Sequence, residues 1–262
     1  MSARRLSELN RRIVACTRCP RLREHCVKTA REKRASFRDW DYWGKPVPNF
    51  GAVSARPASG DKSGEGSGGI TGGIAGGGGR SGGGWLLVVG LAPAAHGANR
   101  TGRMFTGDRS GDFLYREMFH AGFASQPHAL RLDDGLKLRN ALITAAAHCA
   151  PPGNKPSGEE LENCAGFLDD TFDVVPGLRV VLCLGGVAMD AVLRLYRRRG
   201  WIERRAPYRF AHGAEYAVDG APTLLCSYHP SQQNTFTGRL TERMLREVFL
   251  RAAAILDAPR DH

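Results

Sequence analysis

The chain has 262 residues, of which 42% are hydrophobic, and it carries a formal net charge of +11 at pH 7. This apolar content is enough to bury a core and excludes wholesale disorder, while the apolar runs are far too short to cross a bilayer. The charged amino terminus lacks the apolar segment of a signal peptide, which predicts a cytoplasmic protein.

The basic excess is concentrated in two segments. Residues 1–45 hold 13 Lys and Arg against 5 Asp and Glu, and a second basic cluster lies at 193–205. Such a surface is suited to binding a polyanion, and nucleic acid is the preferred interpretation ahead of a membrane surface. A basic surface that only keeps the protein soluble is the alternative. Charge by itself therefore names no substrate.

A glycine-rich segment follows the basic amino-terminal arm. Residues 60–84 contain 14 of the 33 glycines, and such a sequence cannot bury apolar surface. We expect a disordered insert without chemistry of its own. The chain as a whole, residues 1–262, is predicted to form one domain that carries this insert.

From residue 85 onward, apolar runs alternate with helix-like segments. The apolar runs predict strands at 85–91, 141–147, 178–185 and 223–229, the last one paired with 214–218. The other segments predict helices at 110–121, 157–172, 186–199 and 241–258. Gly122 ends the first helix, and Ser157 opens the second in a capping box with Glu160. The alternation predicts an α/β fold, a three-layer αβα sandwich with a mostly parallel central sheet, in which ligands bind beyond the carboxyl ends of the strands.

Four of the seven cysteines have the spacing of a metal site. Cys16 and Cys19 form a C-x-x-C pair, and Cys149 and Cys164 are separated by 14 residues that include a proline-rich loop and a helix start. Four thiolates of this kind can hold a tetrahedral zinc ion or an iron–sulfur cluster, and the plain alternative is four buried thiols.

The other three cysteines are left out of this site. Cys183 and Cys226 fall inside predicted strands and are expected in the core, because free cysteine behaves as a small apolar residue. Cys26 follows the C-x-x-C pair in a basic segment and is not assigned.

Two polar stretches follow predicted strands. GLAPAAHGANRTGRMFTGD, residues 90–108, matches neither the dinucleotide fingerprint nor the phosphate loop. Its Asp108 precedes a helix, where it can cap free N–H groups and still face a cleft, and its Phe105 can offer an exposed stacking face. In SYHPSQQNTFTGRLT, residues 227–241, His229 stands at the carboxyl edge of the sheet. Together the two stretches suit hydrolytic work on a nucleobase.

These two stretches resemble the signature motifs of the family 5, or type B, uracil-DNA glycosylases. The segments CTRCPRLR, RASFRDWDYWGKPVPNFG and LITAAAHCAPPGNKP are also similar to that family. The resemblance implies the fold of the uracil-DNA glycosylase superfamily and hydrolysis of the N-glycosidic bond of a damaged base in double-stranded DNA. It also implies a structural [4Fe–4S] cluster held by Cys16, Cys19, Cys149 and Cys164.

The resemblance implies a role for individual side chains. Asp108 would orient water or stabilise the sugar cation, His229 would donate to the departing base, Phe105 would stack on the flipped base, and Asn154 would position water or substrate. Two further residues, Ala94 and His96, would line the base site. Contacts to the DNA strand would come from Asn234, Thr237 and Arg239.

Two positions depart from the family 4 enzymes, which carry a glutamate and an asparagine where this chain has Leu91 and Ala145. Loss of an amide that reads the uracil edge predicts a relaxed specificity, which extends to hypoxanthine and etheno-adducts. We expect a monomer acting on DNA. The rival interpretations are a non-catalytic iron–sulfur protein that binds nucleic acid as a redox sensor, and a zinc-held nucleic-acid module.

Overall fold

The computed structural model describes residues 2–53 and 84–259, so the predicted insert lies outside the described residues except for Gly84. The elements in chain order are α1 (Ser2–Val14), α2 (Pro20–Glu32), η1 (Ala35–Phe37), β1 (Trp85–Gly90), α3 (Ala98–Thr101), α4 (Arg109–His120), β2 (Ala141–Ala145), η2 (Pro152–Asn154), α5 (Gly158–Val174), β3 (Leu178–Leu184), α6 (Gly186–Arg198), β4 (Glu215–Tyr216), β5 (Thr223–Ser227), α7 (Gln232–Phe236) and α8 (Glu242–Asp257).

The five strands form one sheet in the order β2-β1-β3-β5-β4. Four of them run parallel, and the short edge strand β4 pairs antiparallel with β5. The predicted pairing of 214–218 with the last long strand is therefore confirmed, and so is the mostly parallel sheet.

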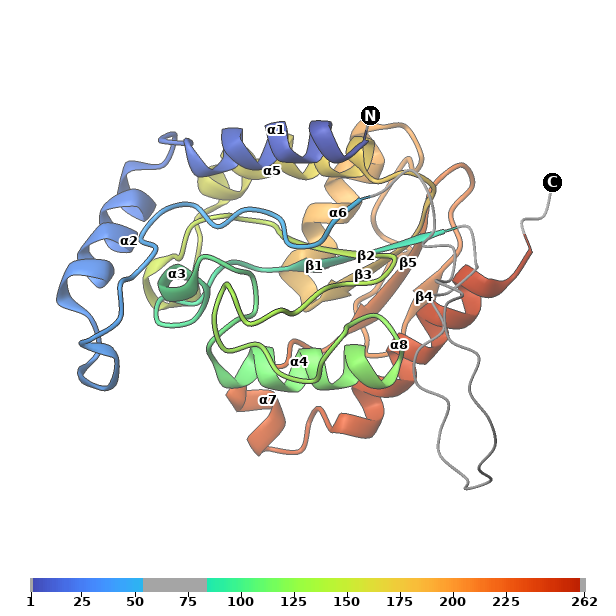
Figure 1. The fold of residues 1–262 in the computed structure, drawn as a ribbon. Coiled ribbons are helices and arrows are strands. Elements are labelled where there is room, and N and C mark those ends of the chain that lie inside the picture. The colour runs from blue at the N-terminus through green and yellow to red at the C-terminus, as the bar shows by residue number, and fades with distance from the viewer. Residues whose placement is uncertain (1, 54–83, 260–262) are drawn as a thin grey trace, which may run out of the picture.

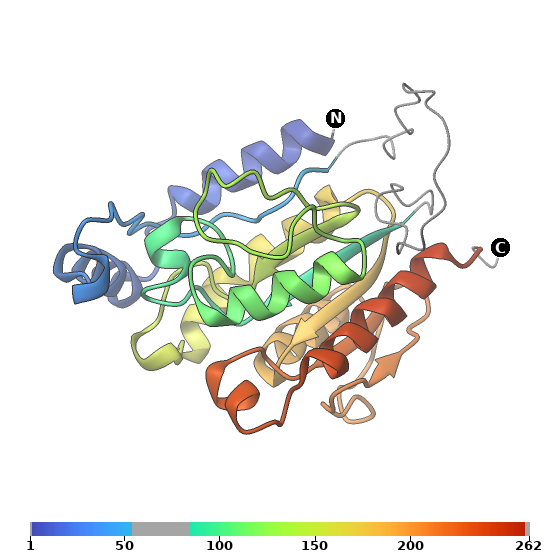
Figure 2. The ribbon, with the colours of Figure 1, turned by 60° about the horizontal axis from the view of Figure 1, so that its bottom comes forward.

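Helices cover both faces of this sheet, as Figures 1 and 2 show. Leu86 and Val88 of β1 belong to the core shared with α4 and α8, while Leu87 and Val89 belong to the core shared with α1, α5 and α6. Parallel strands that are buried on both faces read as continuous apolar runs, which is why WLLVV was recognisable as a strand. The predicted αβα sandwich is confirmed.

Local capping signals agree with the structure. The Ser157–Glu160 capping box is present at the start of α5, and the Asp108 side chain accepts a hydrogen bond from the Gly111 N–H at the start of α4. Gly122 follows the end of α4 with a φ of +81°, the left-handed conformation that a glycine at this place supplies without strain.

The two amino-terminal helices were missed by the sequence analysis, which treated this basic segment as an arm without assigned structure. In α1 the buried residues Leu6, Leu9 and Ile13 recur at helical spacing and pack in the core beside α5, so the basic residues are left on the outer side. Within the described residues, no helix combines the length and the apolar character needed to span a membrane.

Candidate active site

The polar stretches that follow β1 and β5 meet beyond the carboxyl ends of the parallel strands, where an α/β sheet places its ligands. A pocket lies between them. It is lined by Gly90, Ala92, Pro93, Ala94, Ala98, Met104, Phe105, Asp108, Ser110, Ala145 and His229. Four residues singled out from the sequence, Ala94, Phe105, Asp108 and His229, are thus brought together by the fold.

Asp108 presents a half-buried carboxylate to this pocket. Its Oδ1 accepts the Gly111 N–H at 3.0 Å, which anchors the side chain at the start of α4. Its Oδ2 lies against Gly97, where a Cβ atom would stand only 2.0 Å away, so Gly97 must be glycine for the carboxylate to occupy this position. Burial raises the pKa of Asp108, and the Gly111 hydrogen bond and the Arg100 charge oppose that rise.

His229 lines the same pocket as Asp108. Burial lowers the pKa of its imidazole to about 4, so the ring is neutral at neutral pH. The backbone of this loop is held by Asn234, whose Nδ2 donates to the His229 carbonyl at 2.8 Å. A neutral imidazole retains one N–H that can donate to a developing negative charge.

Phe105 lines the same pocket in a strained conformation. Its ring centroid is 5.7 Å from that of His229, and a Cβ at Gly90 would approach the Phe105 ring to 2.9 Å. Its φ is +51°, a left-handed value that costs a non-glycine residue on the order of 1–3 kcal/mol. Strain of this kind persists only where surrounding contacts impose it, and it is frequent at functional sites.

A buried polar network surrounds this residue. The Arg103 guanidinium forms an ion pair with Asp134 at 2.6 Å, and its Nε donates to Thr106 Oγ1 at 2.8 Å. The Thr101 hydroxyl donates to the Thr106 carbonyl at 3.1 Å. Arg103, two residues before Phe105, and Thr106, directly after it, are therefore fixed by side chains. Asp134 was not singled out from the sequence, because it is 31 residues away from Arg103.

Several predicted site residues lie outside the pocket lining. Asn154 is exposed, at the end of η2 and with a φ of +57°. His96 is half-buried, with its Nδ1 3.1 Å from Tyr42 Oη. Thr237 and Arg239 are exposed after α7, and the Arg239 guanidinium lies 4.5 Å from the centroid of the Tyr228 ring. The roles given to these side chains stay predictions.

One exposed aromatic residue near this site was not foreseen. Phe236, the last residue of α7, is 66% exposed, and the guanidinium of Arg109, the neighbour of Asp108, lies 4.9 Å from its ring centroid. A phenylalanine in the otherwise polar run QQNTFTG is the signal that could have marked it.

The four predicted ligand cysteines are free thiols that lie near one another. Burial raises the pKa of Cys164 to about 12, and the neighbouring Cys149, Cys19 and Cys16 add to that rise. Cys26, left unassigned from the sequence, packs beside Cys149 in a small buried cluster. Among residues 2–53 and 84–259, however, no three His, Cys, Asp or Glu side chains are arranged so that they could hold a metal ion.

The remaining two cysteines are core residues, as predicted. Cys183 and Cys226 are fully buried, and they are register partners on β3 and β5. Burial raises the pKa of both thiols, to about 12 for Cys226.

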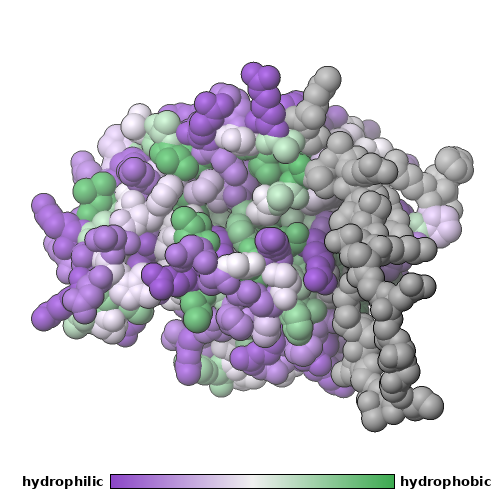
Figure 3. All heavy atoms as spheres, in the orientation of Figure 1, coloured by the Kyte–Doolittle hydropathy of each residue, from purple (hydrophilic) through white to green (hydrophobic). Residues whose placement is uncertain are grey.

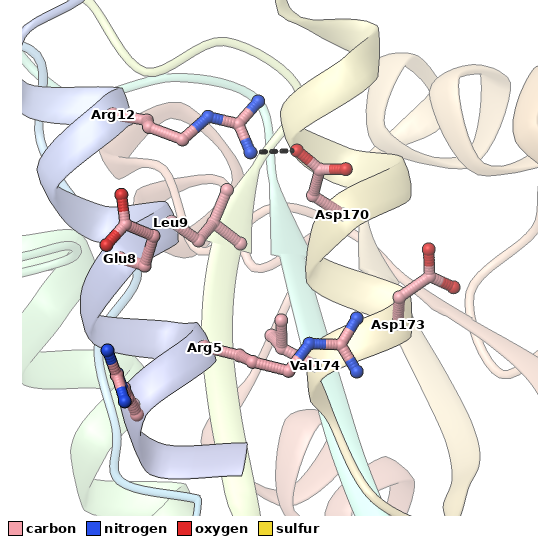
Figure 4. Close-up of a pocket in the computed structure, with 8 residues that line it drawn as sticks. Arg5, Glu8, Leu9, Arg12, Asp170, Asp173 and Val174 are labelled. Atoms are coloured by element: carbon pink, nitrogen blue, oxygen red, sulfur yellow. Dashed lines mark ion pairs between the residues drawn. The ribbon is translucent and has the colours of Figure 1, made fainter. Parts of the chain in front are cut away.

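A separate hollow lies between α1 and α5 (Figure 4). It carries charges of both signs, and an ion pair of 2.9 Å joins Arg12 to Asp170 across it. It shares no residue with the pocket at the sheet edge. Hydrophilic side chains cover most of the face shown in Figure 3, and apolar ones form small separate groups there.

Comparison with known proteins places these features in a family. Residues 84–253 match the protein family that is described as "Uracil DNA glycosylase superfamily". A Mycobacterium leprae protein named type-5 uracil-DNA glycosylase is 42% identical over 245 residues, 93% of each chain. Proteins of the same name from Thermus thermophilus and Pyrobaculum aerophilum are 41% and 39% identical, over 92% and 93% of this chain and 93% and 90% of their own.

Proposed function

Because the chain belongs to the uracil DNA glycosylase superfamily, we propose that it is a DNA N-glycosylase that removes uracil from double-stranded DNA by hydrolysing the N-glycosidic bond. The observation that carries the proposal is a pocket in which a carboxylate, a neutral imidazole and an aromatic ring converge. A base inside a duplex cannot reach such a pocket, so the nucleotide must be flipped out, at a cost that is lowest for a mismatched base.

His229 is suited to stabilising the departing base. Bond cleavage leaves negative charge on the base, and a preorganised N–H donor stabilises that charge as it develops. The imidazole is neutral because burial holds its pKa at about 4. It therefore acts as a hydrogen-bond donor whose proton stays on the ring, comparable to other neutral histidines in enzyme sites.

Asp108 is suited to stabilising the sugar on the other side of the same bond. As the bond breaks, the deoxyribose gains oxocarbenium character, and an ionised carboxylate nearby stabilises that positive charge or orients the attacking water. The Gly111 N–H holds Oδ1 at 3.0 Å, while Oδ2 lies against Gly97. Ionisation is required for this role, so the raised pKa of Asp108 sets the acidic limit of activity.

The specificity of the pocket is proposed to extend beyond uracil. Phe105 offers a stacking face, while the lining beside it is formed by small residues such as Gly90, Ala92 and Ala145. Ala145 ends β2, where it has no side-chain amide to read a pyrimidine edge. A pocket that does not hydrogen-bond one base edge rejects other bases weakly, which favours hypoxanthine and etheno-adducts as additional substrates.

The duplex is proposed to lie over the rim formed by α7 and the start of α4. Arg109 and Arg239 are exposed there and can contact phosphates, as can Thr237. The exposed ring of Phe236 is suited to packing against a base step that flipping has opened. Asn234 acts differently, since its side chain holds the His229 loop.

We also propose that Cys16, Cys19, Cys149 and Cys164 hold a [4Fe–4S] cluster. The four free thiols influence one another electrostatically, which supports a shared site. Each cluster ligand binds a different iron, so the thiols need not converge on one point as they would around a single zinc ion. The cluster would tie α1 and α2 to η2 and α5, and no catalytic step requires it.

Cleavage of labelled duplexes tests this function. Duplexes with one U·G, one hypoxanthine·T or one ethenocytosine·G pair are incubated with the protein and then treated with alkali, which breaks the strand at an abasic site. Cleavage of the U·G duplex supports the glycosylase, and cleavage of all three supports the wide specificity. Tight duplex binding without any cleavage, by protein that contains iron and sulfide, favours the redox-sensor interpretation instead.

A further inference from the structure

We propose that Arg100 is a positioning residue for Asp108, and that the amino-terminal arm segment 34–44 holds Arg100 in place through Phe37 and Trp40. The proposal rests on the glycosylase function above. It assigns a role in the reaction to a segment that lies outside the superfamily match at 84–253.

Arg100 links the two ends of the loop that carries the site. Its side chain is 3% exposed; Nε donates to the His96 carbonyl at 2.8 Å, and Nη2 donates to the Gly107 carbonyl at 2.6 Å. Gly107 directly precedes Asp108, and a Cβ there would stand 2.5 Å from Nη2, so glycine is required for this close approach. The guanidinium therefore fixes the position of the Gly107 backbone, and with it the position of the adjacent Asp108.

The arm supplies the surface on which this guanidinium rests. The Arg100 Cζ lies 3.9 Å from the Phe37 ring centroid and 4.1 Å from the Trp40 ring centroid, and the two rings form an edge-to-face pair. The backbone fixes the same contact, since the Trp43 N–H donates to the Arg100 carbonyl at 2.9 Å. A planar guanidinium stacks on aromatic faces in a way that an ammonium group does not reproduce.

Loss of the rings would release Arg100 rather than leave it in place. Without the two rings the guanidinium is exposed to water. It can then be hydrated if it turns away from the Gly107 carbonyl. Gly107 would then keep only its N–H bond to the Ala129 carbonyl, which is 3.0 Å long. A displacement of the catalytic group by about 1 Å is enough to lower a rate on the order of 10²-fold.

The same guanidinium contributes to the ionisation of Asp108. The charged and titratable groups around this carboxylate are Arg100 on α3, Asp112 and Tyr115 on α4, and His229 after β5. Burial and the Asp112 charge raise the pKa of Asp108, while the Arg100 charge lowers it. Displacing Arg100 therefore raises the pKa of Asp108 further, so on acidification the carboxylate becomes protonated at a higher pH.

The test compares three variants of the full chain with the unaltered protein. The first is the double variant Phe37→Leu with Trp40→Leu, and the second, Phe37→Tyr with Trp40→Phe, keeps both rings. The matched control is Trp201→Leu, which removes the ring 5.3 Å from the Arg199 guanidinium, away from the pocket. For each protein we would measure the single-turnover rate on a U·G duplex, the duplex Kd, the Tm and the pH profile.

We expect the double leucine variant to cleave about tenfold to 10²-fold more slowly, with a Kd within about twofold and an acidic limb shifted to higher pH. The aromatic variant and Trp201→Leu should keep the rate of the unaltered protein. A full rate in the double leucine variant overturns the inference. So does a weakened, salt-sensitive Kd at an unchanged rate, because that result makes the arm a DNA contact.

A second readout separates this inference from the proposed function. The titration of the Asp108 carboxyl, followed by NMR of carboxyl-labelled protein, needs no activity. If the unaltered protein cleaves no duplex, the glycosylase proposal fails, and the titration still decides on Arg100. A pKa of Asp108 that is higher in the double leucine variant supports positioning by the arm, and an unchanged pKa contradicts it.

Discussion

The two loops that form the pocket are built in opposite ways. The loop after β1 is held by buried polar side chains, with Asn99, Arg100, Arg103 and Thr106 all 3% exposed or less. The loop after β5 is mostly half-buried or exposed from Ser231 to Arg239 and contains only the five-residue helix α7. The first loop is thus fixed by internal contacts, while most of the second is accessible to solvent. Changes in the first loop and at His229 should therefore alter the rate, and changes from Ser231 to Arg239 should alter DNA affinity.

The largest effect is expected at Asp108. Asp108→Asn keeps the hydrogen bond to the Gly111 N–H but removes the negative charge that is proposed to act on the sugar, and the single-turnover rate should fall roughly 10²–10⁴-fold. The duplex Kd should stay within about twofold, which a binding assay on the same U·G duplex would check. A variant that binds normally and cleaves normally would remove Asp108 from the mechanism.

The pH profile sharpens the assignment of this residue. Because the pKa of Asp108 is raised, the rate should fall on acidification at a pH above the usual range of an aspartate. His229 is neutral down to about pH 4, so it does not account for a loss above that pH. The acidic limb should therefore be absent from the residual activity of Asp108→Asn.

His229→Gln is expected to have the next largest effect. The change removes the N–H donor that is proposed to stabilise the departing base, and loss of such a donor lowers rates roughly 10²–10³-fold in comparable sites. The loss should be largest for uracil and smaller for a base that leaves easily without help. Equal losses for good and poor leaving groups would contradict a role on the base side of the bond.

The third effect concerns stability, at the ion pair that fixes the first loop. Asp134→Ala leaves the Arg103 charge buried without its partner, which costs about 3–5 kcal/mol of unfolding free energy. Burial alone would raise the pKa of Asp134, but the Arg103 guanidinium and three backbone N–H groups hold it well below the usual range. This contribution is therefore present at neutral pH and is lost only in strong acid, as thermal unfolding at several pH values would check.

The smallest effect is expected in the second loop. Phe236→Ala removes an exposed ring that packs against no core, so the Tm should stay nearly constant. Duplex affinity should fall about tenfold or less, the scale of one base-stacking contact. An unchanged Kd together with a large loss of rate would reverse the division of labour between the two loops.

Much of the fold was readable because its signals are local. Strands buried on both faces, such as β1 and β3, read as apolar runs, and the caps at Asp108 and Ser157 lie within three residues of the N–H groups they serve. The ends of strands were less exact: the strand predicted at 141–147 ends at Ala145. The placement of Asp108 and His229 at one edge of the sheet followed from the parallel strands, since both side chains come after strands whose carboxyl ends lie at that edge, with β3 between β1 and β5.

Helix α1 was readable in principle, because Leu6, Leu9 and Ile13 recur at helical spacing, yet its basic residues drew the interpretation toward an arm. The placement of Asn154 away from the pocket lining could not be read in this way, because it depends on how η2 packs.

The sequence by itself thus determined the strand–helix alternation, the caps and the two loops that carry the candidate site. Only the tertiary structure decided the electrostatics and strain of that site. Arg103 meets Asp134 across 31 residues, Arg100 meets Phe37 across 63, and burial by the whole fold lowers the pKa of His229. Contacts between residues so far apart leave no helical or strand periodicity in the sequence. They form only when the core has packed.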